Sequence, residues 1–338
     1  MLLLSLAWGD AAASAQLGEM SIEALLEQEL VEMEVTGIHH THPKGEWMIG
    51  YHYMRMNMEG NLDGTSDVSV PEIFAEGFMV APTSMWMEMH MIHGMYGLTD
   101  KLTLMIVLPF ERKSMDHVRA MGLGQFTTTS GGISDLEFTA LYSLWRTDRH
   151  RLIGGLTITA PTGSIDVRGF VPGMMGNPVR LPYPMQLGSG TWDFIPELTY
   201  IGQVPKWQWG ANVGGTLRAG TNDNNYTLGN AYEVMAWGAR KLTDWSSLNV
   251  RLKWSQWFNI DGADPQLNPM MVPTADPNRR AGRRLDFLAG LSVFTGSGKL
   301  EGLRLTVDGG TPIYQSLDGP QLETDWMVGA MLEWTFGS

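Results

Sequence analysis

The sequence predicts an all-β protein, a transmembrane antiparallel β-barrel of about 12 strands, on three observations. From residue 45 onward apolar residues recur at every second position in most segments, which is the period of a β-strand. Short turns alternate with long polar loops along the same region. Charged residues make up only 17% of the chain, whereas glycine (40 residues) and tryptophan (13 residues) are abundant. This combination is typical of an outer-membrane barrel rather than a soluble enzyme.

Twelve segments match the alternating pattern of a strand. The pattern is clearest near the end of the chain, where Val328, Leu332 and Trp334 alternate with polar or small residues. The predicted strands are residues 45–58, 84–98, 101–110, 132–146, 149–160, 191–204, 206–219, 227–241, 245–260, 282–297, 301–314 and 322–336.

The connections between these strands predict a sidedness. The tight turns are Thr99-Asp100, Thr147-Asp148-Arg149, Val204-Pro205, Thr243-Asp244 and Gly296-Ser297-Gly298. The longer polar loops are residues 59–83, 111–131, 161–190, 220–226, 261–281 and 315–321. Aromatic residues near strand ends fit the girdles at the two membrane interfaces: Trp47, Tyr96, Trp207, Trp245, Trp334 and Phe336. Short turns on one side and long loops on the other are the pattern of a porin-like barrel in the outer membrane of a Gram-negative bacterium.

The first 44 residues predict export and a periplasmic segment. Residues 1–15 read as a signal-peptide remnant, with an apolar start and the cleavage pattern Ala13-Ser14-Ala15. Residues 16–44 contain a helical pattern over Ser21 to Met33, followed by a linker that contains histidines. No segment has the roughly 18 consecutive apolar residues of a membrane helix, so strands must make any membrane crossing, in a closed barrel. The barrel is therefore expected over residues 45–338.

Charge and composition exclude several classes of function. The formal net charge of -13 and the absence of a basic face argue against a nucleic-acid partner. The absence of cysteine removes both disulfides and thiolate metal sites. No arrangement of nucleophile and base, metal triad or phosphate loop is identifiable, so we expect neither an enzyme nor a required cofactor.

The run Met85-Trp86-Met87-Glu88-Met89-His90-Met91 places a methionine at every second position. The next predicted strand has a purely aliphatic face, made of Leu102, Leu104, Ile106 and Leu108, which must face lipid. Pairing the two strands across a tight turn directs the odd-numbered methionines into the lumen. Glu88 and His90 then point outward, and Glu88 is expected at or above the outer interface.

The first strand gives the same result, and 13 of the 24 methionines fall between residues 45 and 121. Thioethers bind Cu(I) in preference to harder ions, and imidazole binds copper in either oxidation state. His39, His40 and His42 are candidates for a separate copper or zinc site at the inner mouth. The candidate metal ligands are Met48, His52, Met54, Met56, Met58, Met85, Met87, Met89, Met91, His93, Met95, Met105, Met115, His117, His39, His40 and His42. Methionine is also a flexible filler and an adaptable surface for an apolar solute, and the residues alone leave these alternatives open.

The same alternation predicts a charged interior elsewhere in the barrel. The expected inward residues are Asp135, Glu137, Asp193, Glu197, Glu233, Arg251, Lys253, Asp286, Arg304, Asp308, Asp325 and Glu333. We interpret most of them as a network of salt bridges and hydrogen bonds, which a polar barrel interior requires.

Two segments, MYGLTDKLTLMIVLPF (residues 95–110) and GGISDLEFTALYSLWRTD (residues 131–148), carry a family resemblance, and Thr159 to Gly163 adds a later T-x-P-T-G. They resemble the outer-membrane transporter family named after the meta-cleavage pathway of phenol degradation. The resemblance implies a barrel that moves small molecules across the outer membrane. The methionine-rich first three strands and the segment Lys113 to His117 depart from that pattern. In composition they look more like outer-membrane copper-resistance proteins.

Our interpretation is an outer-membrane transporter or channel with a lumen lined by methionine and histidine, handling a soft metal ion such as Cu(I) or Cu(II). The first alternative is a channel for small hydrophobic or aromatic solutes. The second is a structural or partner-binding barrel without transport. The expected partners are outer-membrane lipid, a metal ion or small hydrophobic solute, and a periplasmic partner bound through residues 16–44.

Overall fold

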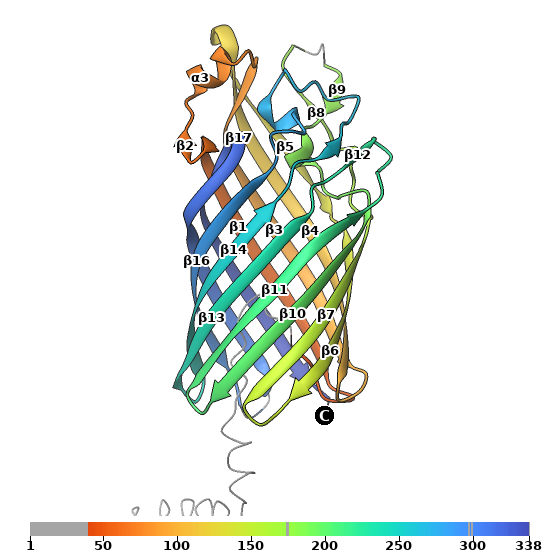
Figure 1. The fold of residues 1–338 in the computed structure, drawn as a ribbon, viewed down its shortest axis with the longest axis vertical. Helices are drawn as coiled ribbons and strands as arrows, with labels where there is room; N and C mark the ends of the chain where they lie inside the picture. The colour runs from red at the N-terminus through yellow and green to blue at the C-terminus, as the bar shows by residue number, and fades with distance from the viewer. Residues whose placement is uncertain (1–39, 174–175, 297, 299, 338) are drawn as a thin grey trace, which may run out of the picture.

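The strands close into a single antiparallel β-barrel (Figure 1). The computed structural model describes residues 40–173, 176–296, 298 and 300–337. Closure comes from the last strand element pairing with the first, so the predicted fold class is confirmed. The signal-peptide remnant, the helix over Ser21 to Met33 and His39 lie outside the described residues. The predicted domain boundaries stay a prediction.

Eleven strand elements form the wall, and the last of them crosses it twice. They are β1 (Trp47–Gly64), β3 (Val80–Gly97), β4 (Leu102–Arg119), β6 (Leu136–Arg146), β7 (His150–Ala160), β10 (Trp192–Val204), β11 (Trp207–Ala219), β13 (Ala231–Thr243), β14 (Ser246–Trp257), β16 (Gly282–Phe294) and β17 (Leu303–Phe336). Residues 304–317 of β17 pair with β16, whereas Leu317 and residues 321–336 pair with β1. Gln315 and Thr324 bond to each other across the two parts. The wall is therefore crossed twelve times, as predicted.

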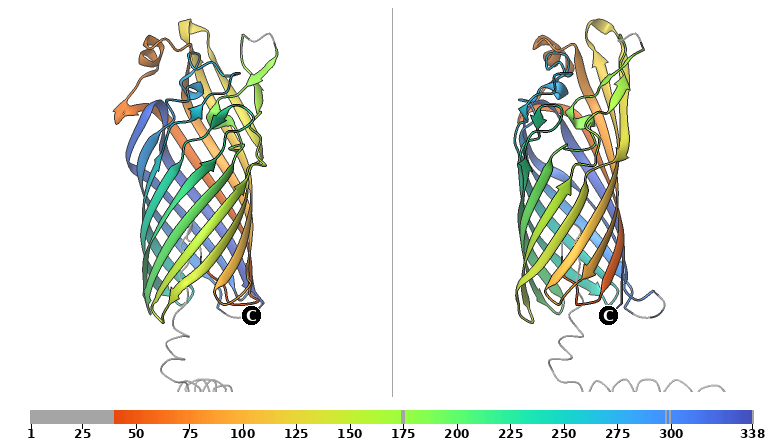
Figure 2. Two further views of the ribbon diagram at one scale, coloured as in Figure 1. Left: turned by 45° about the vertical axis from the view of Figure 1, so that its right-hand side comes forward. Right: turned by 90° about the vertical axis from the view of Figure 1, so that its right-hand side faces the viewer.

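The two ends of the barrel differ as the connections predicted. Long segments gather at one end, and short turns and the C-terminus lie at the other (Figures 1 and 2). The smaller elements are β2 (Ser66–Asp67), α3 (Val70–Ala75), η1 (Ala120–Gly122), β5 (Gln125–Ile133), β8 (Arg168–Phe170), β9 (Pro178–Arg180), η2 (Tyr183–Met185), β12 (Tyr226–Thr227), β15 (Asp261–Gly262) and η3 (Pro273–Ala275). Among the described residues, no helix has both the length and the hydrophobicity to cross a membrane.

Three strands extend further than the sequence predicted. β1, β3 and β4 each have 18 residues and project past the barrel at the long-loop end. There β4 pairs with β5, from Phe110 opposite Ile133 to Val118 opposite Gln125. The predicted loops 59–83 and 111–131 are therefore partly strand. This hairpin stands outside lipid, so the residues of the two segments are largely polar. They therefore lack the apolar alternation on which the strand prediction depended.

The outer surface of the barrel is an apolar band. Ile92, Ile106 and Leu108 on β3 and β4 are all exposed on it. At the short-turn end Trp47 lies beside Tyr96, with ring centroids 4.4 Å apart, and Trp334 lies beside Phe336 at 5.1 Å. Aromatic pairs at one level are what an interfacial girdle requires.

Glu88 and His90 lie on this outer surface, as predicted, and both have partners there. Glu88 Oε1 forms an ion pair with Arg55 at 2.8 Å and accepts a hydrogen bond from the Tyr53 hydroxyl at 3.0 Å. His90 Nδ1 and the Tyr51 hydroxyl are 2.7 Å apart. These contacts neutralise the charge of Glu88 and occupy one nitrogen of His90. They therefore lower the free-energy cost of placing both side chains near lipid.

One predicted inward residue is placed wrongly. Asp325 is exposed, because the pairing register of β17 with β1 shifts between Trp326 opposite Asn57 and Thr324 opposite Met58. A bulge of this kind exchanges the two faces of a strand beyond it. Met327 and Thr324 are consequently both buried, although their separation of three would place them on opposite faces of a regular strand.

Candidate functional site

The lumen contains two chambers. The lower chamber, toward the short turns, has a volume of about 570 Å³, and the upper chamber, beneath the long loops, has a volume of about 440 Å³. Met56 and Arg284 line both chambers and mark the junction between them. A solute that crosses the barrel through these chambers passes this pair.

One side of the lower chamber is a methionine wall on β1, β3, β4 and β17. Its members are Met48, Met54, Met56, Met91, Met95, Met105, Met327 and Met331. The strand register brings the thioethers together in rows. Met48 is directly opposite Met95, which is opposite Met105 on the next strand. Met56 lies between Met87 on one side and Met327 on the other.

The predicted inward direction of these methionines is therefore correct. Met87 and Met89 are half-buried and have the parity of the methionine wall, although they do not line either chamber. Met327 and Met331 were not predicted as part of the site. Met331 lies opposite His52, and Met327 opposite Met56, only because the barrel closes between its first and last strands. The signal available in the sequence was their spacing of four residues, which places both side chains on the same face of a strand.

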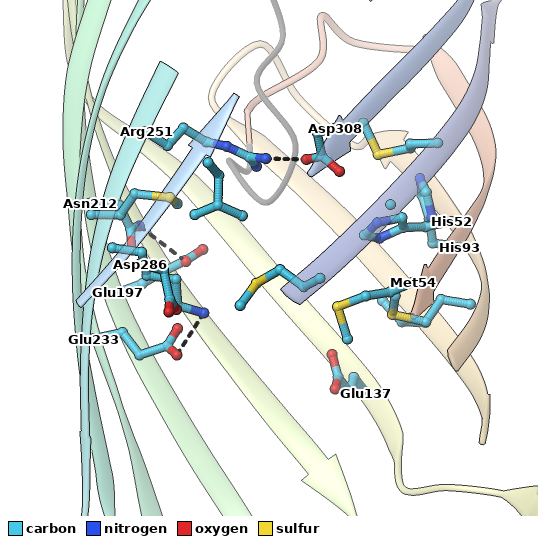
Figure 3. A pocket seen from close by; sticks show the side chains of 18 of the residues that line it. His52, Met54, His93, Glu137, Glu197, Asn212, Glu233, Arg251, Asp286 and Asp308 are labelled. Carbon is cyan, nitrogen blue, oxygen red and sulfur yellow. Dashed lines mark hydrogen bonds and ion pairs between the residues drawn. The ribbon is translucent and has the colours of Figure 1, made fainter. Parts of the chain in front are cut away.

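The opposite side of the lower chamber is an ionic wall. It consists of Glu197, Glu233, Arg251, Lys253, Arg284 and Asp286, whereas Glu137 lines the chamber beside the methionine wall, opposite Val107 of β4. Lys253 Nζ is 2.8 Å from Glu233 Oε1, and Arg284 Nε is 2.8 Å from Asp286 Oδ1. Arg251 pairs with Asp308 of β17. Figure 3 shows the carboxylates of Glu197, Glu233 and Asp286 across the chamber from Met54, His52 and His93.

The predicted histidine ligands separate into different environments. His52 and His93 line the lower chamber, and His93 Nε2 is 3.4 Å from Glu333 Oε1. His40 also lines this chamber, and its ring centroid is 4.6 Å from that of His42. Within the described parts of the chain, no group of three or more His, Asp or Glu side chains has the geometry to hold a metal ion.

Residues 40–45 lie against the barrel wall at the short-turn end, and His40 lines the lower chamber. The backbone N–H of His42 donates to Thr103 Oγ1 at 2.8 Å, and His42 Nδ1 lies 2.7 Å from Glu46 Oε2. Gly97 permits this approach, since a Cβ there would lie 1.9 Å from the Pro43 carbonyl oxygen. The segment is thus held against the inner face of β4.

The upper chamber is mainly apolar. Its apolar lining comes from both strands and long loops: Met56, Met58, Met85, Met115, Tyr183, Leu228, Trp257, Phe258, Ile260, Leu317 and Leu322. Met58, Met85 and Met115 were predicted as metal ligands and lie here in register across β1, β3 and β4. Met85 and Met115 pack in a cluster with Leu181 and Met185 from the loop above.

His117 stands apart from both chambers. It is 3% exposed, and its ring stacks on Phe126 of β5 with centroids 4.7 Å apart. Burial lowers the pKa of His117 to about 4, so the ring is neutral at neutral pH. The structure therefore gives His117 a packing role in the projecting hairpin, outside the linings of both chambers.

Residues 161–173 and 176–190, which we call the cap, lie at the long-loop end, where Tyr183 and Pro184 line the upper chamber. Both stems of the cap are bound by Asp135, whose carboxylate accepts hydrogen bonds from the backbone N–H groups of Gly163 (2.8 Å) and Ser189 (2.7 Å). In the cap, Arg180 pairs with Asp264 of the neighbouring loop at 3.0 Å, and both side chains are almost fully buried. Asp135, predicted to be inward, thus fastens the cap.

A closed antiparallel barrel with an apolar outer band, aromatic girdles and a chambered lumen defines a bacterial outer-membrane channel. The chain belongs to the family described as "Putative MetA-pathway of phenol degradation", whose model matches residues 88–266. The predicted family and the predicted location in the outer membrane are both confirmed. Among curated proteins, no sequence match was found.

Comparison with solved structures supports the fold through one of them. An outer membrane channel from Pseudomonas putida F1 superimposes with a TM-score of 0.60 at 16% identity, covering 90% of this chain and 100% of that one. A Pseudomonas aeruginosa FadL homologue gives a TM-score of 0.40 at 12% identity, covering 87% and 90%. The TodX monoaromatic hydrocarbon channel gives 0.44 at 10% identity, covering 88% and 91%. At 16% identity the likeness to the Pseudomonas putida channel is evidence of fold alone, and the other two TM-scores are too low to support any argument.

Proposed function

We propose that this protein is a non-enzymatic channel for small hydrophobic or aromatic solutes. One observation carries the proposal: methionines of the same three strands line both chambers and meet at the junction. Met58, Met85 and Met115 of β1, β3 and β4 line the upper chamber, Met56 lines both chambers, and Met54, Met91 and Met105 line the lower one. A solute at the junction can therefore contact apolar side chains in either chamber.

Methionine suits such a surface for two physical reasons. Its unbranched side chain adapts to solutes of different shape, and its sulfur makes favourable contacts with aromatic rings. The lower chamber, at about 570 Å³, is also within the size range of small-molecule sites. The family description, which names phenol degradation, agrees with a cargo of this size. These points support an organic solute more directly than a metal ion.

The proposal predicts that benzyl alcohol interrupts the ion current of single channels in a planar bilayer. Replacing Met54, Met56 and Met91 together with glutamine, which has a similar length but a polar amide, is expected to lower the frequency of interruption roughly fivefold. Met121→Gln is the matched control, since Met121 is 83% exposed on the long-loop side. Equal interruption in the triple variant and the wild type would contradict the proposal.

A second candidate function is passage of copper, and the register of the methionine wall supports it. Rows of directly opposed thioethers offer a soft ion a series of weak sites. Purified protein titrated with Cu(I) under reducing conditions is expected to bind at least one ion per chain. Replacement of Met87, Met89 and Met91 by leucine is expected to weaken that binding. Binding no greater than that of a methionine-poor barrel would refute this candidate.

A further inference from the structure

The upper chamber combines an apolar lining with arginine side chains. Arg218, Arg280 and Arg284 line it together with four methionines and the rings of Trp257 and Phe258. Among the described residues, no Asp or Glu side chain lines this chamber. Its volume of about 440 Å³ is within the range of sites that hold a small organic molecule. A lining of this kind suits a molecule with an apolar body and an anionic group.

The three arginines differ in how their charges are balanced. Arg218 forms an ion pair with Asp193, whose side chain is fully buried. Arg284 Nε lies 2.8 Å from Asp286 Oδ1. Within the part of the chain that the structure describes, no carboxylate forms an ion pair with Arg280, which donates to neutral oxygens instead. The charge that is available to a ligand in this chamber therefore belongs to Arg280.

Neutral groups hold the guanidinium of Arg280 in place. Its Nε donates to the carbonyl oxygen of Arg279 at 2.8 Å, and its Nη2 donates to Gln321 Oε1 at 2.6 Å. The backbone N–H of Arg280 donates to Asn259 Oδ1 at 2.7 Å. The Nη1 atom is buried without a hydrogen-bond partner. Because a buried charged donor without an acceptor is costly, an acceptor oxygen brought by a ligand lowers the free energy of this group.

Arg280 is charged at neutral pH. Burial lowers the pKa of Arg280 to about 10, and the nearby carboxylate of Asp276 opposes that change. Asp276 itself lies 3.4 Å from Arg279 Nε and does not line the chamber, so it does not occupy the place of a ligand. A guanidinium in apolar surroundings is poorly screened by water, which strengthens its attraction for an anion.

An aromatic surface lies beside Arg280. Trp257, Gly282 and Leu317 are in register across β14, β16 and β17. A Cβ at Gly282 would lie 2.7 Å from Trp257 Cζ2 and 2.8 Å from Leu317 Cδ2, so both side chains cover the backbone two residues after Arg280. Two residues span at most about 7 Å of backbone, so the cation and the indole are within reach of one small molecule.

We propose that the upper chamber is a binding site for a small aromatic carboxylate, with the carboxylate at Arg280 and the ring against Trp257 and the methionines. This inference rests on the proposed function and names the substrate class within it. Guanidinium and carboxylate form charge-assisted hydrogen bonds, and the indole and thioethers contact the ring. An aryl alcohol makes the same ring contacts with a weaker hydrogen bond, whereas an aryl ammonium is repelled.

The test is equilibrium dialysis of the full-length protein in a non-ionic detergent, with protein-free micelles as the background. Radiolabelled benzoate is expected to bind one site per chain at least roughly tenfold more tightly than benzylammonium, which has the same ring and the opposite charge. Acetate carries the carboxylate without the ring. It is expected to displace benzoate only at concentrations roughly tenfold higher than unlabelled benzoate requires.

Substitutions separate the contribution of the charge from that of the ring. Arg280→Gln is expected to lower benzoate affinity roughly tenfold, and Arg280→Lys should retain part of it, because lysine keeps the charge without the planar fork. Trp257→Leu is expected to lower benzoate affinity roughly threefold. Arg283→Gln is the matched control, since Arg283 is exposed over the Tyr314 ring and lines neither chamber.

Equal binding of benzoate and benzylammonium, or an Arg280→Gln variant that binds benzoate like the Arg283→Gln control, would overturn the site. Interruption of the channel current by benzyl alcohol tests the proposed function separately. If benzyl alcohol interrupts the current and benzoate does not bind, the proposed function stands and this inference fails. If benzoate binding depends on Arg280 and benzyl alcohol has no effect, the site is supported and the proposed function fails. A heat-modifiability gel identifies any variant that does not fold, and Arg280→Lys keeps the test valid if Arg280→Gln is lost.

Discussion

Substituting lysine for Ile106 is expected to destabilise the folded barrel by about 2–4 kcal/mol. Ile106 lies on the outer surface of β4 and is 45% exposed in a band of aliphatic side chains. A lysine there must place its ammonium in hydrocarbon or bend toward the interface, and both are costly near the middle of the bilayer. The measurement is the urea dependence of folding into lipid vesicles.

The matched control is the next residue of the same strand. Val107 is buried and lines the lower chamber, where it lies opposite Glu137 of β6. Val107→Lys therefore puts the same charge into a polar lumen beside a carboxylate, and a clearly smaller loss of stability is expected. Equal losses for Ile106→Lys and Val107→Lys would show that β4 does not separate lipid from lumen by alternation.

Replacing Asp264 with alanine is expected to lower the stability of the cap by about 3–5 kcal/mol, because it leaves the Arg180 guanidinium buried and without its main partner. The side chains of Arg180 and Asp264 are 3% and 2% exposed, and the backbone N–H of Asp264 also donates to the Tyr183 hydroxyl at 3.0 Å. Hydrogen exchange over residues 161–190 measures the local loss. Single-channel conductance is expected to rise, since Tyr183 and Pro184 of the cap line the upper chamber.

Arg180 also supplies the control for this prediction. Its Nη2 lies 2.6 Å from Asp166 Oδ1, at a distance like that of the buried pair, but the Asp166 side chain is 65% exposed. Water screens such a pair, so Asp166→Ala is expected to change cap stability by less than about 1 kcal/mol. If both variants altered exchange equally, burial would not be the source of the strength of the Arg180–Asp264 pair.

The methionine wall shows how far the sequence could be interpreted. The directions of Met54, Met56 and Met91 followed from the period of two, because a strand has only two faces and its neighbour showed which one meets lipid. The contribution of Met327 did not follow, since it depends on closure between the first and last strands. Asp325 was predicted on the wrong face because a bulge is a single local shift that leaves no periodic signal.

The fastening of the cap was beyond prediction for another reason. Arg180 and Asp264 are 84 residues apart in the chain and meet only because their strands bring both loops over one mouth. Nothing in the local sequence of a loop specifies such a partner, whereas each strand carries its own pattern.

By itself the sequence determined the membrane barrel, its number of strands, its two different ends and the inward direction of the methionines in β1 and β3. These properties follow from alternation, turn length and composition, which are local. Only the tertiary structure decided that the lumen divides into two chambers beneath a fastened cap. Those properties arise where distant loops and strands converge, and the physical reason is that the burial of a side chain depends on everything that encloses it rather than on any one segment.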